Sequence, residues 1–282
     1  MTLHFEFWSR LMGRDDRMIE TRAQARSGGK PLTQATTQRA GGQRDARLVV
    51  VVPSRGRPES LREFARSVRA TSTEETEVIF AVDEDDPRYE EYWAISRCEA
   101  VRLFAQRTGT MVSALNSAVT ALMAPDSPNP PFAIAFMGDD NRPRSPGWDA
   151  SFLRTLRSLG TGLVYGDDLL QGASLPAHVA MTGDLVRVLG WMAPPGLTHL
   201  FADRAWLELG RGLDRIAYLP SVVVEHLHPF ACSAIIDEGY QRVNSPEMYQ
   251  RDGAEFERWV KDELPLCLSR IISELVAKAY DI

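Results

Sequence analysis

The sequence predicts an α/β protein with a mostly parallel sheet flanked by helices, and three patterns lead to this fold class. The run Leu48–Val52 is apolar without alternation, which is typical of a strand buried on both faces. Strand patterns then alternate with helical patterns, which predicts parallel strands joined by right-handed crossovers. Polar clusters follow three of the predicted strands, at the edge where sheets of this kind bind ligands.

The first half of the predicted domain sets out these elements in order. Pro53 stops the first strand, and Pro58 suits the first turn of the following helix because its fixed φ fits there. Leu61, Phe64 and Val68 recur at helical spacing and predict one buried helix face. The expected elements are a strand at 48–52, a helix at 58–70, a strand at 77–82, a helix at 89–96, a strand at 100–104, a helix at 110–123 and a strand at 132–137.

The second half shows shorter patterns, and C-terminal helices close the chain. Its expected elements are a helix at 150–159, a strand at 162–165, helices at 183–189 and 201–209, a strand within 216–227, and helices near 246–261 and 264–279. We therefore divide the chain into an N-terminal extension, 1–46, a main domain, 47–245, and C-terminal helices, 246–282.

The N-terminal extension is predicted to be flexible. Residues 21–46 are rich in Gly, Gln, Thr, Arg and Ala, and Leu32 is their only large aliphatic residue. Such a composition cannot bury enough apolar surface to order the chain. Residues 1–20 fit either a short amphipathic helix, with Phe5 and Trp8 on one side, or a frayed extension.

The overall composition limits the classes of function that the sequence fits. A net charge of −6 disfavours a surface built mainly for nucleic acid, because phosphate binding requires a basic face. The three cysteines are far apart and none forms a CxxC, which fits a reducing compartment. The sequence has no apolar run long enough to span a bilayer and no secretory signal. We expect a cytoplasmic enzyme without integral membrane contact.

The adjacent carboxylates Asp139 and Asp140 stand directly after a predicted buried strand. Such a pair repels itself unless a positive group compensates it, and oxygen ligands of this kind suit Mg²⁺ or Mn²⁺. The alternative is an Asp-Asp-Asn turn that only caps the strand. Asp167 and Asp168 form a second acidic pair after a strand and compete for the same role.

Two further features would carry chemistry. His226 and His228 stand at the end of the last predicted strand, and if the strand continues they share one face. They are then either ligands for Mn²⁺ or partly buried histidines bonded to the backbone. Asp203 stands near the start of a predicted helix, where it is either a general base or a helix cap with Arg204 as its ion partner.

The order of these motifs resembles a known family. Pro-Ser-Arg-Gly-Arg-Pro follows the first strand at 53–58, Gly-Asp-Asp-Asn follows a later strand at 138–141, and His-x-His-Pro comes at 226–229. Over roughly residues 47–230 this order is similar to the GT-A (Rossmann-like) fold of family 2 glycosyltransferases. The greatest likeness is to glycosyltransferase-like proteins of actinobacterial phages, which show a similar Pro-Gly-Trp-Asp stretch, here at 146–149.

The resemblance implies a role for each motif. It implies that the first half, 47–141, binds the nucleotide sugar and that the second half, 142–245, binds the acceptor. The implied nucleotide-binding residues are Pro53, Ser54, Arg55, Arg57, Asp83, Asp85, Asn116 and Asp139, with Asp83 facing the base and Asn116 in the helix over the ribose. The implied metal ligands are Asp140, His226 and His228, and the implied catalytic base is Asp203.

The activity that the resemblance implies is transfer of a sugar from a nucleotide sugar, expected to be a UDP-sugar, to an acceptor hydroxyl with inversion. Mn²⁺ or Mg²⁺ would assist, and the acceptor would be a glycan, a protein or a modified DNA base. A phage-encoded enzyme would act in the host cytoplasm. Ala202 replaces the carboxylate that commonly precedes the base, so an inactive sugar-binding or scaffold protein is an alternative. A sugar-phosphate nucleotidyltransferase is another, although it would need a Gly-rich loop with Lys.

We expect a truncated chain that begins near Arg44 to fold and to turn over donor as the full chain does. The reason is that residues 1–46 cannot support a packed core. Thermal unfolding and donor turnover, each compared with the full-length protein, measure this. Loss of folding would instead show that the N-terminal segment docks on the domain.

Overall fold

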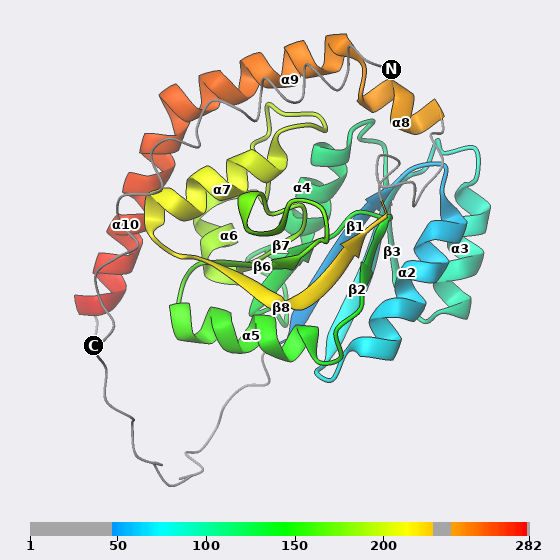
Figure 1. Ribbon diagram of the computed structural model, residues 1–282, viewed down its shortest axis with the longest axis horizontal. Coiled ribbons are helices and arrows are strands. Elements are labelled where there is room, and N and C mark those ends of the chain that lie inside the picture. The colour runs from blue at the N-terminus through cyan, green and yellow to red at the C-terminus, as the bar shows by residue number, and fades with distance from the viewer. Residues whose placement is uncertain (1–46, 228–237, 281–282) are drawn as a thin grey trace, which may run out of the picture. The chain divides into compact units, whose positions relative to one another are not determined.

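A computed structural model describes residues 47–227 and 238–280, which all lie in one compact unit, Arg44–Ile282. Eight strands form a sheet in the order β3-β2-β1-β4-β7-β6-β8-β5, with helices on both faces (Figure 1). This architecture confirms the predicted α/β class. The N-terminal extension, His228 and residues 229–237 lie outside the described residues.

The first half of the chain builds the parallel part of the sheet. Each of these strands runs parallel to its neighbour, in the order β3-β2-β1-β4. The strands are β1 (Leu48–Ser54), β2 (Thr76–Asp83), β3 (Arg102–Gln106) and β4 (Ala133–Phe136), each within a few residues of its predicted bounds. The helices between them are α2 (Pro58–Thr71), α3 (Tyr89–Cys98) and α4 (Met111–Leu122).

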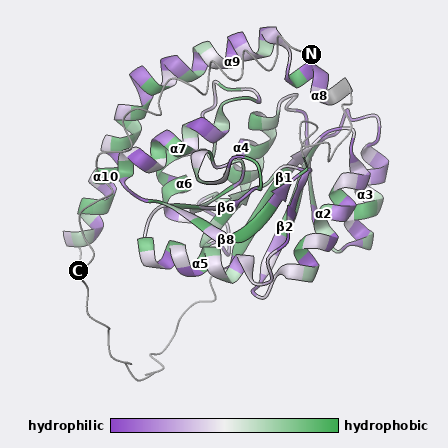
Figure 2. Cartoon of the chain, in the orientation of Figure 1, coloured by the Kyte–Doolittle hydropathy of each residue, from purple (hydrophilic) through white to green (hydrophobic). Residues whose placement is uncertain are grey.

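The absence of alternation in β1 follows from burial on both of its faces. Val49 and Val51 pack into a cluster with α4, while Val50 and Val52 pack into a second cluster with α2 and α3. Removing this apolar surface from water on both sides of the sheet is the main favourable contribution to the fold. Hydrophobic residues gather in the sheet and on the helix faces turned toward it, whereas hydrophilic residues lie outside (Figure 2).

The second half adds two antiparallel strands that the sequence patterns did not predict. β5 (Asn141–Pro143) pairs antiparallel with β8, and β7 (Val179–Thr182) lies antiparallel between β4 and β6. The remaining elements of this half are α5 (Trp148–Leu159), β6 (Leu163–Asp167), the short helix η1 (Gly172–Ser174), α6 (Gly183–Leu189), α7 (Ala202–Leu213) and β8 (Ile216–His226).

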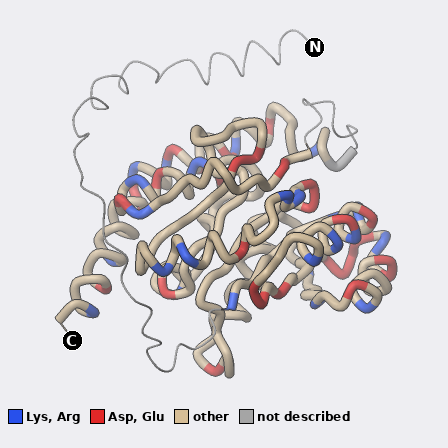
Figure 3. Tube along the Cα trace, turned by 60° about the horizontal axis from the view of Figure 1, so that its bottom comes forward, with Lys and Arg blue, Asp and Glu red and all other residues tan. Residues whose placement is uncertain are grey.

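The C-terminal helices pack against α6 and α7. After α8 (Glu238–Val243), the helix α9 (Pro246–Arg258) continues through a π-helical turn, η3 (Trp259–Glu263), into α10 (Leu264–Tyr280). Lys278 reaches Asp184 of α6 at 2.8 Å, and Arg270 donates to the carbonyl of Leu189 at 2.9 Å. Positive and negative positions are mixed along the outer helices (Figure 3). In the described ranges, no helix has both the length and the apolar character needed to cross a bilayer.

The Pro-Gly-Trp-Asp stretch has a structural function. Trp148 is fully buried in the cluster beside Phe152, with their ring centroids 5.5 Å apart, and is therefore a core residue. Asp149 is also fully buried. Its carboxylate accepts from the amides of Thr73 and Glu74 at 3.0 and 2.9 Å, which fixes the loop between α2 and β2 to the start of α5.

We expect Asp149→Ala to lower the free energy of unfolding by about 2–4 kcal/mol, because buried amide groups would lose their acceptor. Denaturant unfolding followed by circular dichroism measures this. Asp126→Ala, at an exposed loop position, is the control and should leave stability unchanged. Equal stability of both variants would contradict the interpretation.

Candidate functional site

Three polar segments meet at the carboxyl ends of the parallel strands. β1 ends at Ser54, β2 ends at Asp83, and Gly138-Asp139-Asp140 follows β4. Because β1 lies between β2 and β4, these ends are neighbours in the sheet. The structure thus brings together the strand-end clusters that the sequence predicted to converge.

Asp139 lies buried in the middle of this edge. Its Oδ2 accepts from the hydroxyl of Ser54 at 2.6 Å, and its Oδ1 faces Nη1 of Arg57 at 3.4 Å. Burial and the neighbouring charge of Asp140 raise the pKa of Asp139 to about 6, although Arg57 and Ser54 oppose this shift. Both carboxylate oxygens of Asp139 are therefore engaged by the segment that follows β1.

The backbone around Asp139 is fixed by residues that the sequence analysis did not single out. Ser60 of α2 donates to the carbonyl of Asp139 at 2.7 Å, and the nearly buried Arg142 donates to the same carbonyl at 2.8 Å. A Cβ at Gly138 would lie 2.5 Å from Oδ1 of Asp140, so a larger residue there would displace that carboxylate. The turn after β4 is consequently held in one conformation.

Asp140 points toward the last long strand. Oδ2 of Asp140 lies 3.4 Å from Nε2 of His226, and both side chains are partly exposed, at 30% and 21%. The pairing of β5 with β8 places Asn141 opposite His226, and the amide of Leu227 donates to the carbonyl of Asp140. Burial alone would lower the pKa of His226, but the hydrogen bond and charge of Asp140, together with the charges of Asp168 and Asp203, raise it.

The side chains of Asp140 and His226 are of the types that bind a divalent metal ion. A carboxylate and an imidazole that share one partly exposed face are suitable ligands for Mn²⁺. Among residues 47–227 and 238–280, three or more such side chains do not gather around one point, so Asp140 and His226 would supply two ligands. β8 ends at His226, and His228 lies outside the described residues.

Asp203 is the second residue of α7. Its charge raises the pKa of His226, and burial raises the pKa of Asp203 itself. Its half-buried carboxylate accepts from the amide of Arg204 at 2.7 Å. α7 has no side-chain cap, and Phe201 stands at its N-cap position with φ of 65°. The bond from the Arg204 amide is a first-turn contact of the kind that a capping residue makes, so the general base and the cap stay alternative roles for Asp203.

The expected base-binding residues lie at the end of β2, where protein groups already contact them. Asp83 accepts from the amide and hydroxyl of Thr108 at 2.7 and 2.8 Å, and from Gly109 at 3.1 Å. Nη1 of Arg55 lies 3.2 Å from Asp83 and 2.7 Å from the exposed Asp85. Arg55 thus connects the two carboxylates, and Asp83 also anchors the loop before α4.

Other predicted residues are engaged by the protein itself. Pro53 is buried within β1. The amide of Asn116 is bonded to the backbone of Met192 and Ala193, which ties α4 to the loop before α7. In the competing acidic pair, Oδ1 of Asp168 accepts from three amides of its own loop. This arrangement favours a turn-forming role for Asp168.

Two residues near the site carry no sequence motif. The hydroxyl of Tyr92 accepts from the amide of Arg57 at 2.6 Å and contacts Ser54, so α3 supports the loop after β1. His199 lies near Asp140, and burial lowers its pKa although Asp140 and Asp252 oppose the shift. Neither residue stands in a recognisable pattern, since only the tertiary fold brings them to this edge.

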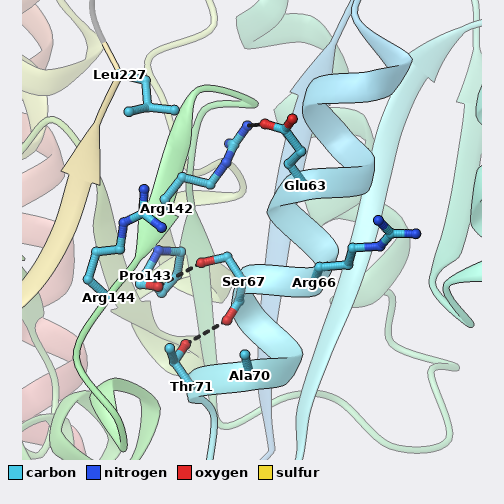
Figure 4. Close-up of a pocket in the computed structure, with 9 residues that line it drawn as sticks. All are labelled: Glu63, Arg66, Ser67, Ala70, Thr71, Arg142, Pro143, Arg144 and Leu227. Carbon is cyan, nitrogen blue, oxygen red and sulfur yellow. Dashed lines mark hydrogen bonds and ion pairs between the residues drawn. The ribbon is translucent and has the colours of Figure 1, made fainter. Parts of the chain in front are cut away.

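A separate groove of about 550 Å³ lies between α2 and β5 (Figure 4). Three guanidinium groups line it, and each is paired with a carboxylate. The pairs are Arg66 with Glu99, Arg142 with Glu63, and Arg144 with Glu225. Each guanidinium of the groove thus already has an ion partner within the protein.

Comparison with solved structures establishes the fold. The mannosyltransferase PcManGT from Pyrobaculum calidifontis, in complex with GDP-Man and Mn²⁺, matches with a TM-score of 0.53 at 15% identity, over 83% of this chain and 75% of that one. Glucosyl-3-phosphoglycerate synthase from Mycobacterium tuberculosis, in complex with Mn²⁺, UDP and phosphoglyceric acid, also matches with a TM-score of 0.53, at 12% identity over 77% and 79%.

The fold is therefore the GT-A fold of nucleotide-sugar-dependent glycosyltransferases. No protein-family model matches the sequence, and no curated protein matches it. At these identities the likeness describes the architecture, so the activity has to be argued from the site.

Proposed function

We propose that this protein is a metal-dependent glycosyltransferase that moves a sugar from a nucleoside-diphosphate sugar to an acceptor hydroxyl. The observation that carries this proposal is the pairing of Asp140 with His226 at 3.4 Å, next to the buried Asp139. Asp203, at the start of α7, supplies a further carboxylate whose charge acts on the same histidine. These residues come from three elements, and together they offer a cation site and a carboxylate base. The shared GT-A architecture supports the same conclusion.

The donor would bind across the carboxyl ends of β1, β2 and β4. Asp83, Arg55 and Asp85 would face the nucleoside, as the family resemblance implies, while Asp139 and Arg57 would lie beneath the ribose and diphosphate. Asp140 and His226 would hold Mn²⁺ or Mg²⁺, which as a Lewis acid stabilises the leaving diphosphate. In this arrangement Arg57 adds positive charge close to the phosphates.

Asp203 would act as the general base in a single displacement. Its carboxylate takes the proton of the acceptor hydroxyl while the acceptor oxygen bonds to the anomeric carbon. The bond from that carbon to the diphosphate oxygen breaks, and the nucleoside diphosphate leaves with the electron pair. One displacement inverts the anomeric configuration. The raised pKa of Asp203 makes its carboxylate a stronger base than an exposed aspartate.

Two nucleotides are candidates for the sugar donor, uridine diphosphate and guanosine diphosphate. The two similar structures carry GDP-Man in one case and UDP in the other. A screen of UDP- and GDP-sugars by thermal shift, with and without Mn²⁺, would identify the donor, because a true donor stabilises the fold by mass action. Product analysis with glycan, protein and modified-base acceptors would then identify the acceptor class. Donor binding without transfer to any acceptor would favour the inactive alternative.

We expect donor binding to depend on a divalent ion. Asp140→Asn should weaken Mn²⁺ binding and donor binding together, because it removes one of the two proposed ligands. Calorimetric titration with Mn²⁺ alone, and with donor in the presence of Mn²⁺ or EDTA, measures both effects. Asp126→Asn, which makes the same change at an exposed loop position, is the control. Undiminished donor affinity in EDTA would overturn the metal assignment.

We expect Asp203→Asn to abolish transfer and to leave donor affinity nearly intact. The carboxylate is proposed to act only on the acceptor proton, and loss of a general base costs on the order of 10²–10⁴-fold in kcat. Steady-state kinetics and donor titration, together with thermal unfolding, separate catalysis from folding.

Transfer at the wild-type rate by Asp203→Asn would place the base elsewhere. Asp167, Asp168 and Asp184 would then be tested in the same way. An unfolded variant would instead assign a structural role to Asp203.

A further inference from the structure

One face of α9 is built around the segment that leads into α7. Tyr249, Asp252, Gly253 and Phe256 are spaced so that they share one helix face. All four lie against the segment 198–201, which ends two residues before Asp203. The C-terminal helix and the proposed base are thus connected through a stretch of only a few residues.

Asp252 is the centre of this contact and is fully buried. Its Oδ2 accepts from the amides of His199 and Leu200 at 2.9 and 2.8 Å. Its Oδ1 accepts from the hydroxyl of Thr198 at 2.7 Å, and the amide of Thr198 lies 3.3 Å from both oxygens. A single carboxylate therefore accepts from three consecutive backbone amides and one hydroxyl.

Aromatic side chains of α9 pack against Phe201, the last residue of the segment 198–201. Phe201 stacks on Phe256 with centroids 5.6 Å apart and meets Tyr249 edge-on at 6.3 Å. A Cβ at position 253 would approach the Phe201 ring to 3.4 Å, so Gly253 permits close packing. Phe201 adopts φ of 65°, a strained conformation for a phenylalanine, and the surrounding contacts must hold it there.

We propose that Asp252 is a positioning residue for sugar transfer: by holding the backbone of 198–200, it fixes the entry into α7 and so orients Asp203 toward the acceptor. This inference rests on the function proposed above. Phe201 joins the fixed segment directly to the first turn of α7, so a displacement of that segment is passed to Asp203 two residues later. Small displacements of a catalytic group are costly because the reacting atoms must be aligned.

The geometry favours a carboxylate at position 252. The three backbone amides directed at Asp252 can only donate, and a carboxylate presents acceptors on both oxygens. An asparagine would place its NH₂ group against at least one of these N–H groups. Asp252→Asn should therefore loosen the segment while changing the size of the side chain very little.

The test compares Asp252→Asn with Glu257→Gln, which makes the same chemical change at an exposed position of the same helix. We expect Asp252→Asn to lower kcat about 10- to 100-fold with little change in the donor KM. Thr198→Val, which removes one of the hydrogen bonds, should lower kcat in the same direction and by less. Glu257→Gln should have the kcat and the donor KM of the wild type.

Hydrogen exchange at the amides of residues 198–200 provides a readout that does not need activity. Faster exchange at these amides in Asp252→Asn, with unchanged exchange in β1, is the expected result. Wild-type kcat and exchange in Asp252→Asn would overturn the inference while leaving the proposed function in place. If Asp252→Asn does not fold, Thr198→Val decides, and its wild-type kcat would overturn the inference. A wild-type protein that transfers no sugar would overturn the proposed function instead. Hydrogen exchange in Asp252→Asn would still test whether Asp252 holds the backbone of 198–200.

Discussion

The adjacent carboxylates of Asp139 and Asp140 impose the constraint on which the rest of the site depends. Two carboxylates side by side at a strand end repel each other, and each needs its own compensation. Asp139 is compensated by Ser54 and Arg57 after β1, and Asp140 by His226 at the end of β8. The pair therefore ties the first strand of the sheet to the last long one, and the site forms only when the whole fold does.

The surroundings of Asp139 and Asp140 differ in how far each carboxylate is accessible to a cation. Both oxygens of Asp139 are engaged by protein groups, and its side chain is only 9% exposed. Asp140 and His226 keep partly exposed side chains that face each other. A cation arriving from solvent can therefore approach Asp140 more readily than Asp139. The buried carboxylate then acts as a fixed charge behind the open one, which is a favourable arrangement for binding a cation together with a diphosphate.

Much of the first half could be predicted from the sequence because its strands are buried on both faces and its helices keep one apolar face. The convergence of Ser54, Asp83 and Asp139 followed from the same pattern. β5 was missed because it is three residues long and its pairing of Asn141 with His226 joins distant parts of the chain. Arg142 was missed for a related reason, since it acts on a backbone carbonyl that no residue pattern marks.

Two buried carboxylates, Asp149 and Asp252, show that a residue's place in a sequence motif does not by itself reveal its role. Asp149 and Asp252 both accept backbone amides of a distant loop, and both are fully buried. Asp149 belongs to a motif of the resembling proteins, yet it holds the loop between α2 and β2. Asp252 belongs to no motif, yet the segment it holds leads to Asp203. The polar edge at Ser54, Asp83 and Asp139 is thus fixed by neighbouring strands, whereas the segment before the proposed base is held by a helix outside the sheet. The two supports therefore differ in kind: strand pairing fixes the first, and one buried carboxylate that accepts backbone amides fixes the second.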